Sequence, residues 1–243
     1  MTRFFVEKEI FAQDAPVLTG DNAAHAKVLR LKVGEQVLLC DGEANEAVCT
    51  VIDFSQYEVT LQVSERMKSL SEAKVIVRVY MAFPKGDKLE HVIQKATELG
   101  AYEVIAFPSA RCVSRPDEKS LRKKVERWQK IAAGAAEQSG RGRIPKVRVL
   151  PSFQAAVQEA AASDIGVLFY ENEHATTFRM ALAEQNYTSV SLLTGPEGGL
   201  EHSEVAQADA AGLKVCTLGA RILRCETAPL CALSAVMYDS GEF

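Results

Sequence analysis

Residues 190–200 read VSLLTGPEGGL, a short apolar run that leads directly into a glycine-rich loop. The apolar run predicts a buried strand, and a helix is expected beyond the loop at 203–211. Three glycines and a proline allow the backbone to approach a ligand closely and to expose its amide groups. An ordinary tight turn before a helix is the alternative interpretation. Strand, loop and helix in this order indicate one unit of an α/β fold.

The same alternation extends outward through the second part of the chain. Apolar runs predict strands at 75–83, 104–107, 147–150, 165–170, 190–193 and 214–218. Helical spacing predicts helices at 87–99, 117–139, 153–162, 177–185, 203–211 and 228–238. Asp87 and Glu90 resemble a capping box, and Gly100 is a stop signal. Strands alternating with helices predict a mostly parallel sheet covered on both faces.

The first 70 residues have a different pattern. Short apolar or alternating runs predict strands at 4–6, 36–40, 47–52 and 57–63, and one helix is expected at 23–31. This composition suits a small β-barrel. The polar stretch 67–74 is expected to be a linker, so we predict two domains, 1–70 and 71–243.

Composition points to a protein of the cytoplasm. The chain has 243 residues, of which 47% are hydrophobic, and no uncharged run is long enough to span a bilayer. Its N-terminus becomes charged too soon for a secretory signal. Six cysteines show no zinc-ribbon or redox spacing, so we expect most to be small buried apolar side chains and expect no metal.

Positive charge is concentrated in one part of an acidic chain. The net charge is -4, yet residues 111–148 hold twelve Lys or Arg against four Asp or Glu. Such a block is the electrostatic footprint of a polyanion partner, and a solvated helix face is the alternative. The block includes Gly-Arg-Gly-Arg at 140–143, whose arginines either grip phosphates or cap the preceding helix.

A second loop, residues 218–228, follows the last predicted strand and reads LGARILRCETA. Arg221, Arg224 and Glu226 are not needed for packing and suit a site that handles negative charge. A surface turn is the alternative, but Ile222 and Leu223 are expected to tie the loop to the core. The chain has no Walker loop, no early Gly-x-Gly-x-x-Gly and no Gly-x-Ser-x-Gly. These absences disfavour a kinase, a Rossmann dinucleotide enzyme and a hydrolase.

The two loops, taken together, resemble those of the RsmE family, 16S rRNA uridine methyltransferases of the SPOUT class that act on ring nitrogen 3. The likeness extends over nearly the whole chain, through short segments in a fixed order. These include Arg3-Phe-Phe5, His25 to Arg30, Asp41-Gly42, Lys85 to Lys88, Gln94 to Gly100, Arg111-Cys112, Trp128, Ala135 to Gln138 and Arg141.

The resemblance implies a PUA-like barrel for RNA and a C-terminal domain with a deep trefoil knot, which periodicity alone would not suggest. It implies S-adenosylmethionine as cofactor, 16S rRNA of the small ribosomal subunit as partner, and a homodimer. The implied cofactor-binding residues are Thr194, Gly195, Pro196, Glu197, Gly198, Gly199, Leu218, Gly219, Ile222, Leu223, Thr227 and Ala228. The implied RNA-binding residues are Arg3, His25, Lys27, Arg30, Lys85, Lys88, Arg111, Arg141 and Arg143.

The implied catalytic residues are Arg221, Arg224 and Glu226. The target nitrogen of uridine is a poor nucleophile until it loses its proton, so the enzyme must favour the uridine anion. Arg224, helped by Arg221, would stabilise charge on the uracil oxygens, while Glu226 either orients an arginine or accepts the proton. Cys225 stands where the family usually has threonine, and Pro229 is tolerable in a first helical turn.

Three alternatives remain open at this stage. The first is a SPOUT enzyme with another RNA target, which analysis of the methylated nucleoside would separate. The second is a catalytically silent RNA-binding factor of ribosome assembly, which predicts RNA binding without cofactor binding. The third is a small-molecule α/β enzyme, which leaves the basic block unexplained.

Overall fold

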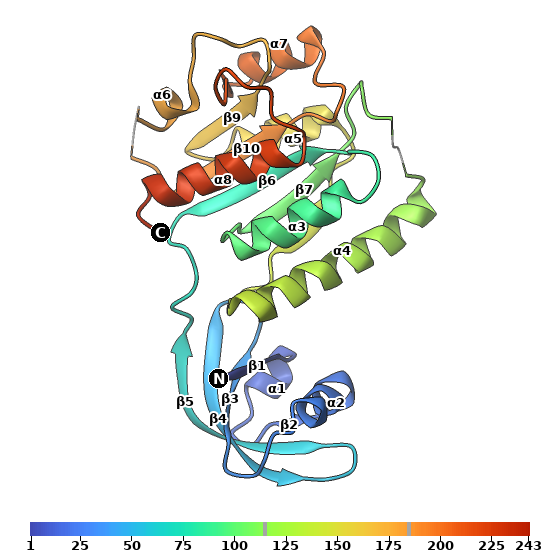
Figure 1. Cartoon of the computed structure of the whole chain (residues 1–243), viewed down its shortest axis with the longest axis vertical. Helices are drawn as coiled ribbons and strands as arrows, with labels where there is room; N and C mark the ends of the chain where they lie inside the picture. The colour runs from blue at the N-terminus through green and yellow to red at the C-terminus, as the bar shows by residue number, and fades with distance from the viewer. Residues whose placement is uncertain (114–115, 184–185) are drawn as a thin grey trace. The chain divides into compact units, whose positions relative to one another are not determined.

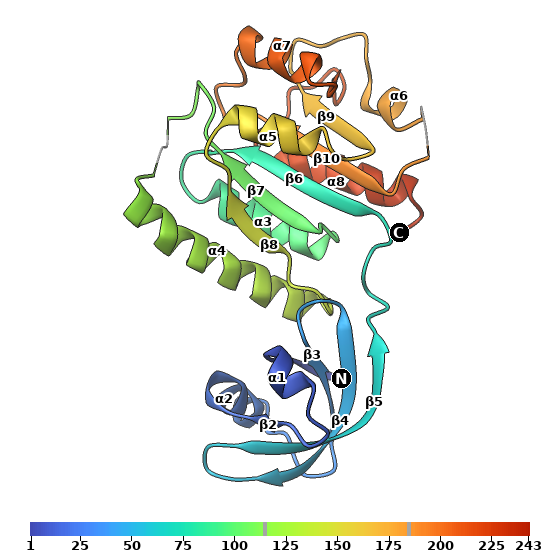
Figure 2. The ribbon, with the colours of Figure 1, turned by 180° about the vertical axis from the view of Figure 1, so that it is seen from behind.

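The computed structural model describes residues 1–113, 116–183 and 186–243. These residues form two compact units. The first comprises Met1–Glu72 together with Ala136–Ile144, and the second comprises Ala73–Ala135 with Pro145–Phe243. Figure 1 and Figure 2 colour the chain from its N-terminus to its C-terminus.

The second unit is built on a six-stranded sheet in which every described pair of neighbours is parallel. The strands are, in spatial order, β11 (Lys214–Cys216), β9 (Ile165–Phe169), β10 (Ser189–Thr194), β6 (Ile76–Ala82), β7 (Glu103–Phe107) and β8 (Lys146–Val149). β7 and β9 are buried along their whole length, because helices cover both faces of the sheet. The predicted parallel α/β sheet is confirmed, and the knot stays a prediction.

Two helices, α3 (Lys88–Glu98) and α8 (Thr227–Asp239), pack against each other on one face of the sheet, and α5 (Phe153–Ala160) covers the other (Figures 1 and 2). α7 (His202–Ala210) contacts α5 and β11, and α6 (Phe178–Ala183) lies beside β9 and β11. α4 (Glu118–Ser139) is the long basic helix that the sequence predicts. The last two residues of the helix predicted at 177–185 lie outside the described residues.

Helix starts differ from the predicted capping. The capping box expected at Asp87 is wrong: Asp87 precedes α3, but its side chain makes no capping hydrogen bond. Glu90 instead pairs with Arg127, with 2.6 Å between the charged atoms. A capping box forms at α7, where Glu201 and Glu204 exchange side-chain and backbone hydrogen bonds. Pro229 lies in the first turn of α8, as expected, where a missing N–H costs nothing.

The first unit contains a curled sheet in the order β1-β3-β4-β5-β2, a half-barrel with β1 and β2 at its described edges. Its strands are β1 (Thr2–Phe5), β2 (Val17–Leu18), β3 (Gln36–Cys40), β4 (Asn45–Phe54) and β5 (Val59–Lys68). The short helix α1 (Lys8–Phe11) and β2 were not predicted, because both are too short for a periodic pattern. α2 (Gly20–Val28) starts and ends three residues earlier than expected, and β5 continues into the predicted linker.

Residues 136–144 belong to the first unit because a buried ion pair holds them there. The Arg141 guanidinium lies 2.6 Å from the Glu72 carboxylate, and Arg141 is only 3% exposed. The same carboxylate accepts hydrogen bonds from the backbone N–H groups of Gly142 and Arg143, at 3.1 and 3.0 Å. The charge of Arg141 is therefore buried and already paired, and its predicted contact with RNA phosphates stays a prediction.

Within the described ranges, no helix combines the length and the apolar character that a bilayer crossing requires. The same ranges contain no group of three or more His, Cys, Asp or Glu placed to bind a metal ion. Five of the six cysteines are buried and Cys231 is exposed, as expected for residues that mostly act as small apolar side chains.

Candidate functional site

Three loops of the second unit follow strand ends at the carboxyl edge of its sheet, where open α/β sheets bind ligands. One joins β6 to α3 at residues 83–87, and one is the glycine-rich loop, 194–200. The third joins β11 to α8 at residues 217–226 and contains most of the arginine loop, which we define as residues 218–228. The two loops singled out by sequence thus lie at strand ends of one sheet.

The glycine-rich loop is closely packed at each of its glycines. A Cβ atom added to Gly195 would lie 3.0 Å from Leu200 Cγ, and one added to Gly198 would lie 3.3 Å from Arg111 Cβ. Gly199 has a φ of +69°, and an added Cβ would overlap the carboxylate of Glu171. An added Cβ would be crowded at all three positions, and at Gly199 the backbone conformation also favours glycine.

Polar side chains around this loop fix its backbone. The buried hydroxyl of Thr194 donates to the Tyr80 carbonyl at 3.3 Å, so this predicted cofactor residue has a structural partner. The Arg111 guanidinium donates to the Gly198 carbonyl at 3.0 Å. The buried carboxylate of Glu204 accepts from the Ala110 N–H at 2.8 Å, which ties α7 to the segment after β7. The loop is therefore positioned by the protein itself.

Lys88 lies where the glycine-rich loop and the arginine loop approach each other. Its ammonium nitrogen is 3.0 Å from Glu197 Oε1 and 3.3 Å from Glu226 Oε2. Glu197 also accepts the backbone N–H of Lys85 at 3.0 Å. The Cys225 thiol donates to Glu226 Oε2 at 3.2 Å and lies 3.8 Å from the Lys88 nitrogen. The sequence predicted Lys88 as an RNA contact, whereas in the structure its charge is taken by these two carboxylates.

The cluster sets the charge states of its members. Burial and the neighbouring Glu226 and Glu197 raise the pKa of the Cys225 thiol to about 12, so it is protonated at neutral pH. Burial raises the pKa of Glu226, but its hydrogen bonds and Lys88 outweigh this, so the pKa falls below its ordinary value of 4.5. The pKa of Glu197 is lowered in the same way, against burial, by Lys88 and backbone N–H groups. Two carboxylates and one ammonium are therefore ionised together near pH 7.

The arginine loop is open where the glycine-rich loop is packed. Arg221 and Arg224 are exposed, and neither side chain has an anionic partner among the described residues. Ile222 is 85% exposed, so the prediction that it ties the loop to the core is wrong. Leu223 is half-buried, and the buried residue that anchors the loop is Cys225. Gly219 has a φ of +109°, and an added Cβ would meet no atom within 4 Å.

Backbone groups of this loop are largely without partners. Within residues 218–223, the described hydrogen bonds are those of Gly219, whose N–H and carbonyl both bond the Thr217 hydroxyl at 3.1 and 3.3 Å. Thr227 and Ala228 bond back to the Arg224 carbonyl at 2.9 and 3.0 Å as α8 begins. The exposed backbone donors and acceptors of 218–223 are available to a ligand.

The remaining predicted RNA contacts are divided between the two units. In the first unit, Arg3 pairs with Glu46, His25 with Glu137 at 3.2 Å, and Lys27 bonds the Gln56 carbonyl. Arg30 there is exposed, with a φ of +57°, and Arg143 is half-buried. In the second unit, Lys85 and Arg111 are exposed beside the glycine-rich loop. The structure therefore leaves Lys27, Arg30, Lys85 and Arg111 reachable, and encloses Arg3 and Arg141 in ion pairs.

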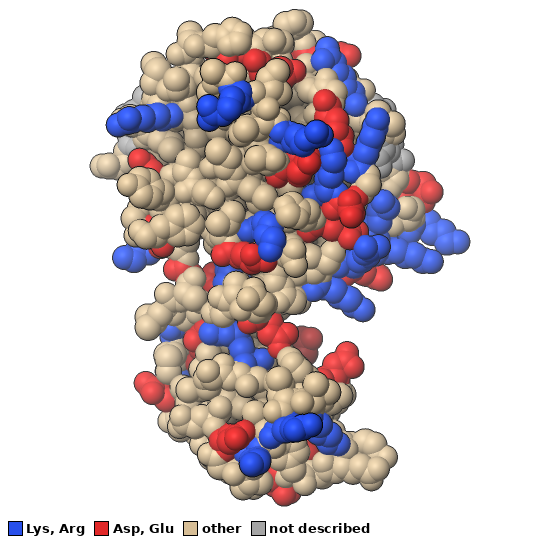
Figure 3. Space-filling view, viewed as in Figure 1, with Lys and Arg blue, Asp and Glu red and all other residues tan. Residues whose placement is uncertain are grey.

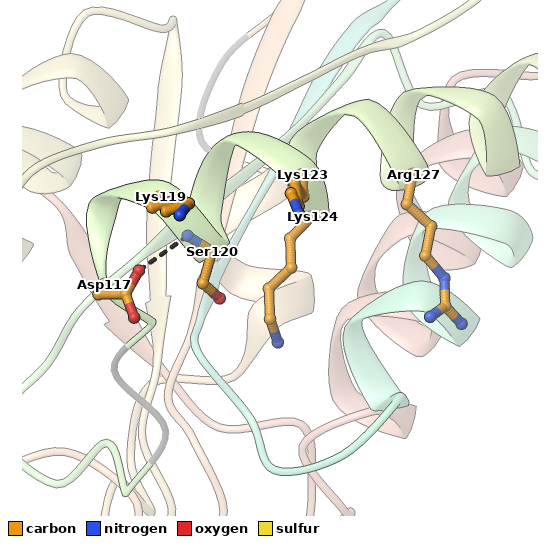
Figure 4. A pocket seen from close by; sticks show the side chains of 6 residues that line it. All are labelled: Asp117, Lys119, Ser120, Lys123, Lys124 and Arg127. Atoms are coloured by element: carbon orange, nitrogen blue, oxygen red, sulfur yellow. Dashed lines mark hydrogen bonds between the residues drawn. The ribbon is translucent and has the colours of Figure 1, made fainter.

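Exposed positive charge gathers on the first half of α4, as the blue side chains in Figure 3 show. A shallow depression there is lined by Asp117, Lys119, Ser120, Lys123, Lys124 and Arg127 (Figure 4). Asp117 accepts the Ser120 N–H at 2.8 Å, and Arg127 is paired with Glu90. Lys119, Lys123 and Lys124 have no carboxylate partner among the described residues. Arg148 is enclosed by Glu103 and Glu159, and Arg115 lies outside the described residues.

Two family models match the chain. Residues 71–237 match an RNA methyltransferase domain, and residues 18–62 match an RNA methyltransferase PUA domain. Together they include both loops, α4 and most of the curled sheet.

Relatives of similar length agree with these matches. Ribosomal RNA small subunit methyltransferase E of Bacillus subtilis is 39% identical over 99% of this chain and 97% of its own. The protein of the same name from Mycobacterium tuberculosis is 36% identical over 90% of this chain and 85% of its own.

Two solved structures resemble the whole chain. Ribosomal RNA small subunit methyltransferase E from Neisseria gonorrhoeae, bound to S-adenosyl methionine, is 28% identical, with a TM-score of 0.82 over 98% of this chain and 97% of that one. A putative methyltransferase from Legionella pneumophila, in complex with the bound cofactor SAM, is also 28% identical, with a TM-score of 0.85 over 98% of both chains. The chain belongs to the RNA methyltransferase family that includes ribosomal RNA small subunit methyltransferase E.

Proposed function

We propose that this chain transfers a methyl group from S-adenosylmethionine to ring nitrogen 3 of a uridine in 16S rRNA of the small ribosomal subunit. The observation that carries the proposal is the convergence of the glycine-rich loop and the arginine loop on Lys88, at the ligand-binding edge of the sheet. Family membership supports the reaction class, and two similar structures that contain the cofactor support its identity.

The residues present fit this cofactor. The glycine-rich loop brings bare backbone to the surface, and residues 218–223, apart from Gly219, have backbone N–H and carbonyl groups that make no described hydrogen bond. Such groups suit the amino, carboxylate and purine parts of the cofactor, which need both donors and acceptors. Thr194, Gly195 to Gly199, Leu218, Gly219, Ile222, Leu223, Thr227 and Ala228 would hold it. When bound, S-adenosylmethionine supplies an electrophilic methyl group on a sulfonium.

The exposed arginines suit the other half of the reaction. We assign Arg224, with Arg221, to stabilising negative charge on the uracil oxygens as nitrogen 3 loses its proton. Both guanidiniums have no anionic partner within the described chain, so binding need not first break an ion pair. Glu226 touches Lys88 and Cys225 rather than an arginine, and its lowered pKa makes it a weak base. We therefore assign Glu226 to holding Lys88 in place rather than to accepting the proton.

The first half of α4, together with the half-barrel of residues 1–70, is proposed to bind RNA phosphates. Lys119, Lys123 and Lys124 carry the charge that helix packing does not use. Replacing Lys123 and Lys124 by alanine should weaken RNA binding across sequences and reduce the salt slope of log Kd by about one to two units. Lys146→Ala, an exposed lysine on β8, is the matched control. A salt slope unchanged in the double variant would remove α4 from the interface.

A homodimer is also proposed, because the family resemblance implies one and because Ile222 and Tyr238 expose large apolar side chains, at 85% and 77%. Sedimentation equilibrium would test it, and a monomer at micromolar concentration would contradict it.

The decisive experiment incubates the protein with labelled S-adenosylmethionine and small ribosomal subunits that lack the modification, followed by mass spectrometry of the digested rRNA. A 3-methyluridine product is expected. A different methylated nucleoside, or transfer only to other RNAs, would keep the assignment as a methyltransferase and change the proposed target. Binding of RNA without binding of cofactor would contradict the enzyme assignment.

A further inference from the structure

Lys88 is the first residue of α3, and it joins two loops that are more than a hundred residues from it in sequence. No described hydrogen bond joins the glycine-rich loop directly to the arginine loop. The link between them is the ammonium of Lys88, which contacts Glu197 of the first and Glu226 of the second. A third strand end joins the same link, because Glu197 also accepts the N–H of Lys85.

Two carboxylates share this ammonium, which distinguishes the link from an isolated surface ion pair. The side chains of Lys88, Glu197 and Glu226 are 28%, 29% and 23% exposed, so water screens them only in part. The buried Cys225 thiol completes the cluster. Without Lys88, two carboxylates would face one site with no cation between them, and their repulsion would separate the loops.

We propose that Lys88 is a positioning residue that holds the glycine-rich loop and the arginine loop at the separation the cofactor requires. The proposal rests on the proposed function, since it assumes that both loops contact S-adenosylmethionine. It does not assign Lys88 to the stability of α3, which is anchored by buried Leu89, Val92 and Ile93. The role is therefore separable from folding.

The test compares Lys88→Met, Lys88→Arg and Lys95→Met by calorimetric titration with S-adenosylmethionine in the absence of RNA. Lys95 is a matched control, because it lies on the same helix and forms an ion pair of 2.8 Å with Glu98, a residue of that helix. We expect Kd to rise about tenfold in Lys88→Met, because one partly buried ion-pair network is lost. Lys88→Arg should recover most of the affinity, and Lys95→Met should stay within about twofold of wild type.

The pH dependence of Kd gives a readout that a merely structural role would not move. Against the effect of burial, Lys88 and backbone N–H groups lower the pKa of Glu197, and hydrogen bonds from the backbone and Cys225, together with Lys88, lower that of Glu226. In the wild type both carboxylates therefore lose their charge only as the pH falls through those lowered values. Removing the ammonium raises both pKa values, so in Lys88→Met acid should neutralise the two carboxylates at higher pH, relieve their repulsion and narrow the difference in Kd from the wild type. Loose packing alone would weaken binding equally at every pH.

The outcomes separate this proposal from the function it rests on. The positioning role alone would be overturned if Lys88→Met bound the cofactor with the wild-type Kd, or if Lys88→Met and Lys95→Met lost equal affinity. Failure of the wild-type chain to bind S-adenosylmethionine would overturn the proposed function and, with it, the role of Lys88. Thermal unfolding of every variant shows that the compared proteins are folded.

Discussion

The glycine-rich loop and the arginine loop follow strand ends of one sheet, but they are built in opposite ways. Each of the three glycines in the first meets an atom that a larger residue would strike, and Thr194 and Arg111 bond its surroundings. In the second, Ile222 projects into solvent, and Arg221 and Arg224 have no described anionic partner. One loop is held in place without a ligand, whereas the other presents charged and backbone groups that a ligand could bind.

This difference separates preorganisation from chemistry. A loop positioned by the protein can hold a cofactor without further ordering, which lowers the entropic cost of binding. A loop with unpaired guanidiniums can meet developing negative charge without first breaking an ion pair. Substitutions in the first loop should therefore affect stability and cofactor affinity, and those at the two arginines of the second should affect turnover.

Arg224→Ala should produce the largest effect, because it removes a charge that acts only on the reacting base. We expect kcat to fall about 100- to 1,000-fold, as on loss of a donor to a developing anion. Cofactor Kd should change by less than about twofold. Rate assays on rRNA and calorimetry with S-adenosylmethionine measure the two quantities. Arg179→Ala, an exposed arginine on α6, should leave both unchanged, and normal turnover in Arg224→Ala would remove it from the mechanism.

Gly199→Ala should have the next largest effect, on folding and cofactor affinity rather than on chemistry. The φ of +69° strains any L side chain, and the new Cβ would overlap the Glu171 carboxylate, so a loss of about 1–3 kcal/mol in the free energy of unfolding is expected. Urea denaturation measures it.

Two other glycines sharpen this test. Gly219→Ala shares the backbone strain, at φ +109°, but meets no atom, and should cost less. Gly134 lies inside α4, and an added Cβ would meet no atom within 4 Å. Gly134→Ala should therefore add about 0.5–1 kcal/mol to the free energy of unfolding. Equal losses at Gly199 and Gly219 would show that contact with Glu171 is unimportant.

The sheet and its helices were predictable because local patterns report them. Gln36–Cys40 was expected as a strand at its observed bounds, and the long runs of the second unit fall within a few residues of their positions. Elements too short to show a periodic pattern were missed, and β2, with two residues, is an example. The ion pair of Arg141 was not predicted because its partner, Glu72, is distant in sequence, and local pattern does not report a buried ion pair.

The two loops of the candidate site could be picked out from the sequence, but the way they are linked could not. The residue types in 194–200 and in 218–228 indicate ligand contacts by themselves, however far apart the two segments lie in the chain. The link through Lys88 depends on three strand ends meeting, which is a property of the sheet order. Ile222 was expected in the core because it is apolar, whereas Cys225 is the buried anchor of the loop.

Changes at Cys225 should have the smallest effects. They test the boundary between the packed and the open regions of the site. Burial raises its pKa to about 12, so the thiol remains protonated and unreactive through neutral pH. Iodoacetamide at pH 8 should modify exposed Cys231 and leave Cys225 intact, as peptide mass spectrometry would report. Modification of Cys225 at the rate of Cys231 would mean that the arginine loop moves and exposes Cys225, its buried anchor.

Substitution at the same position tests what the thiol contributes. Cys225→Thr places a stronger hydroxyl donor beside Glu226 Oε2, so turnover should stay within about threefold of wild type. Cys225→Val has nearly the shape of threonine but no donor, and should lose about one hydrogen bond, or roughly three- to tenfold in turnover. Equal activities in the two variants would assign position 225 to packing alone, whereas a gap between them would place its hydrogen bond to Glu226 among the contacts that hold Lys88.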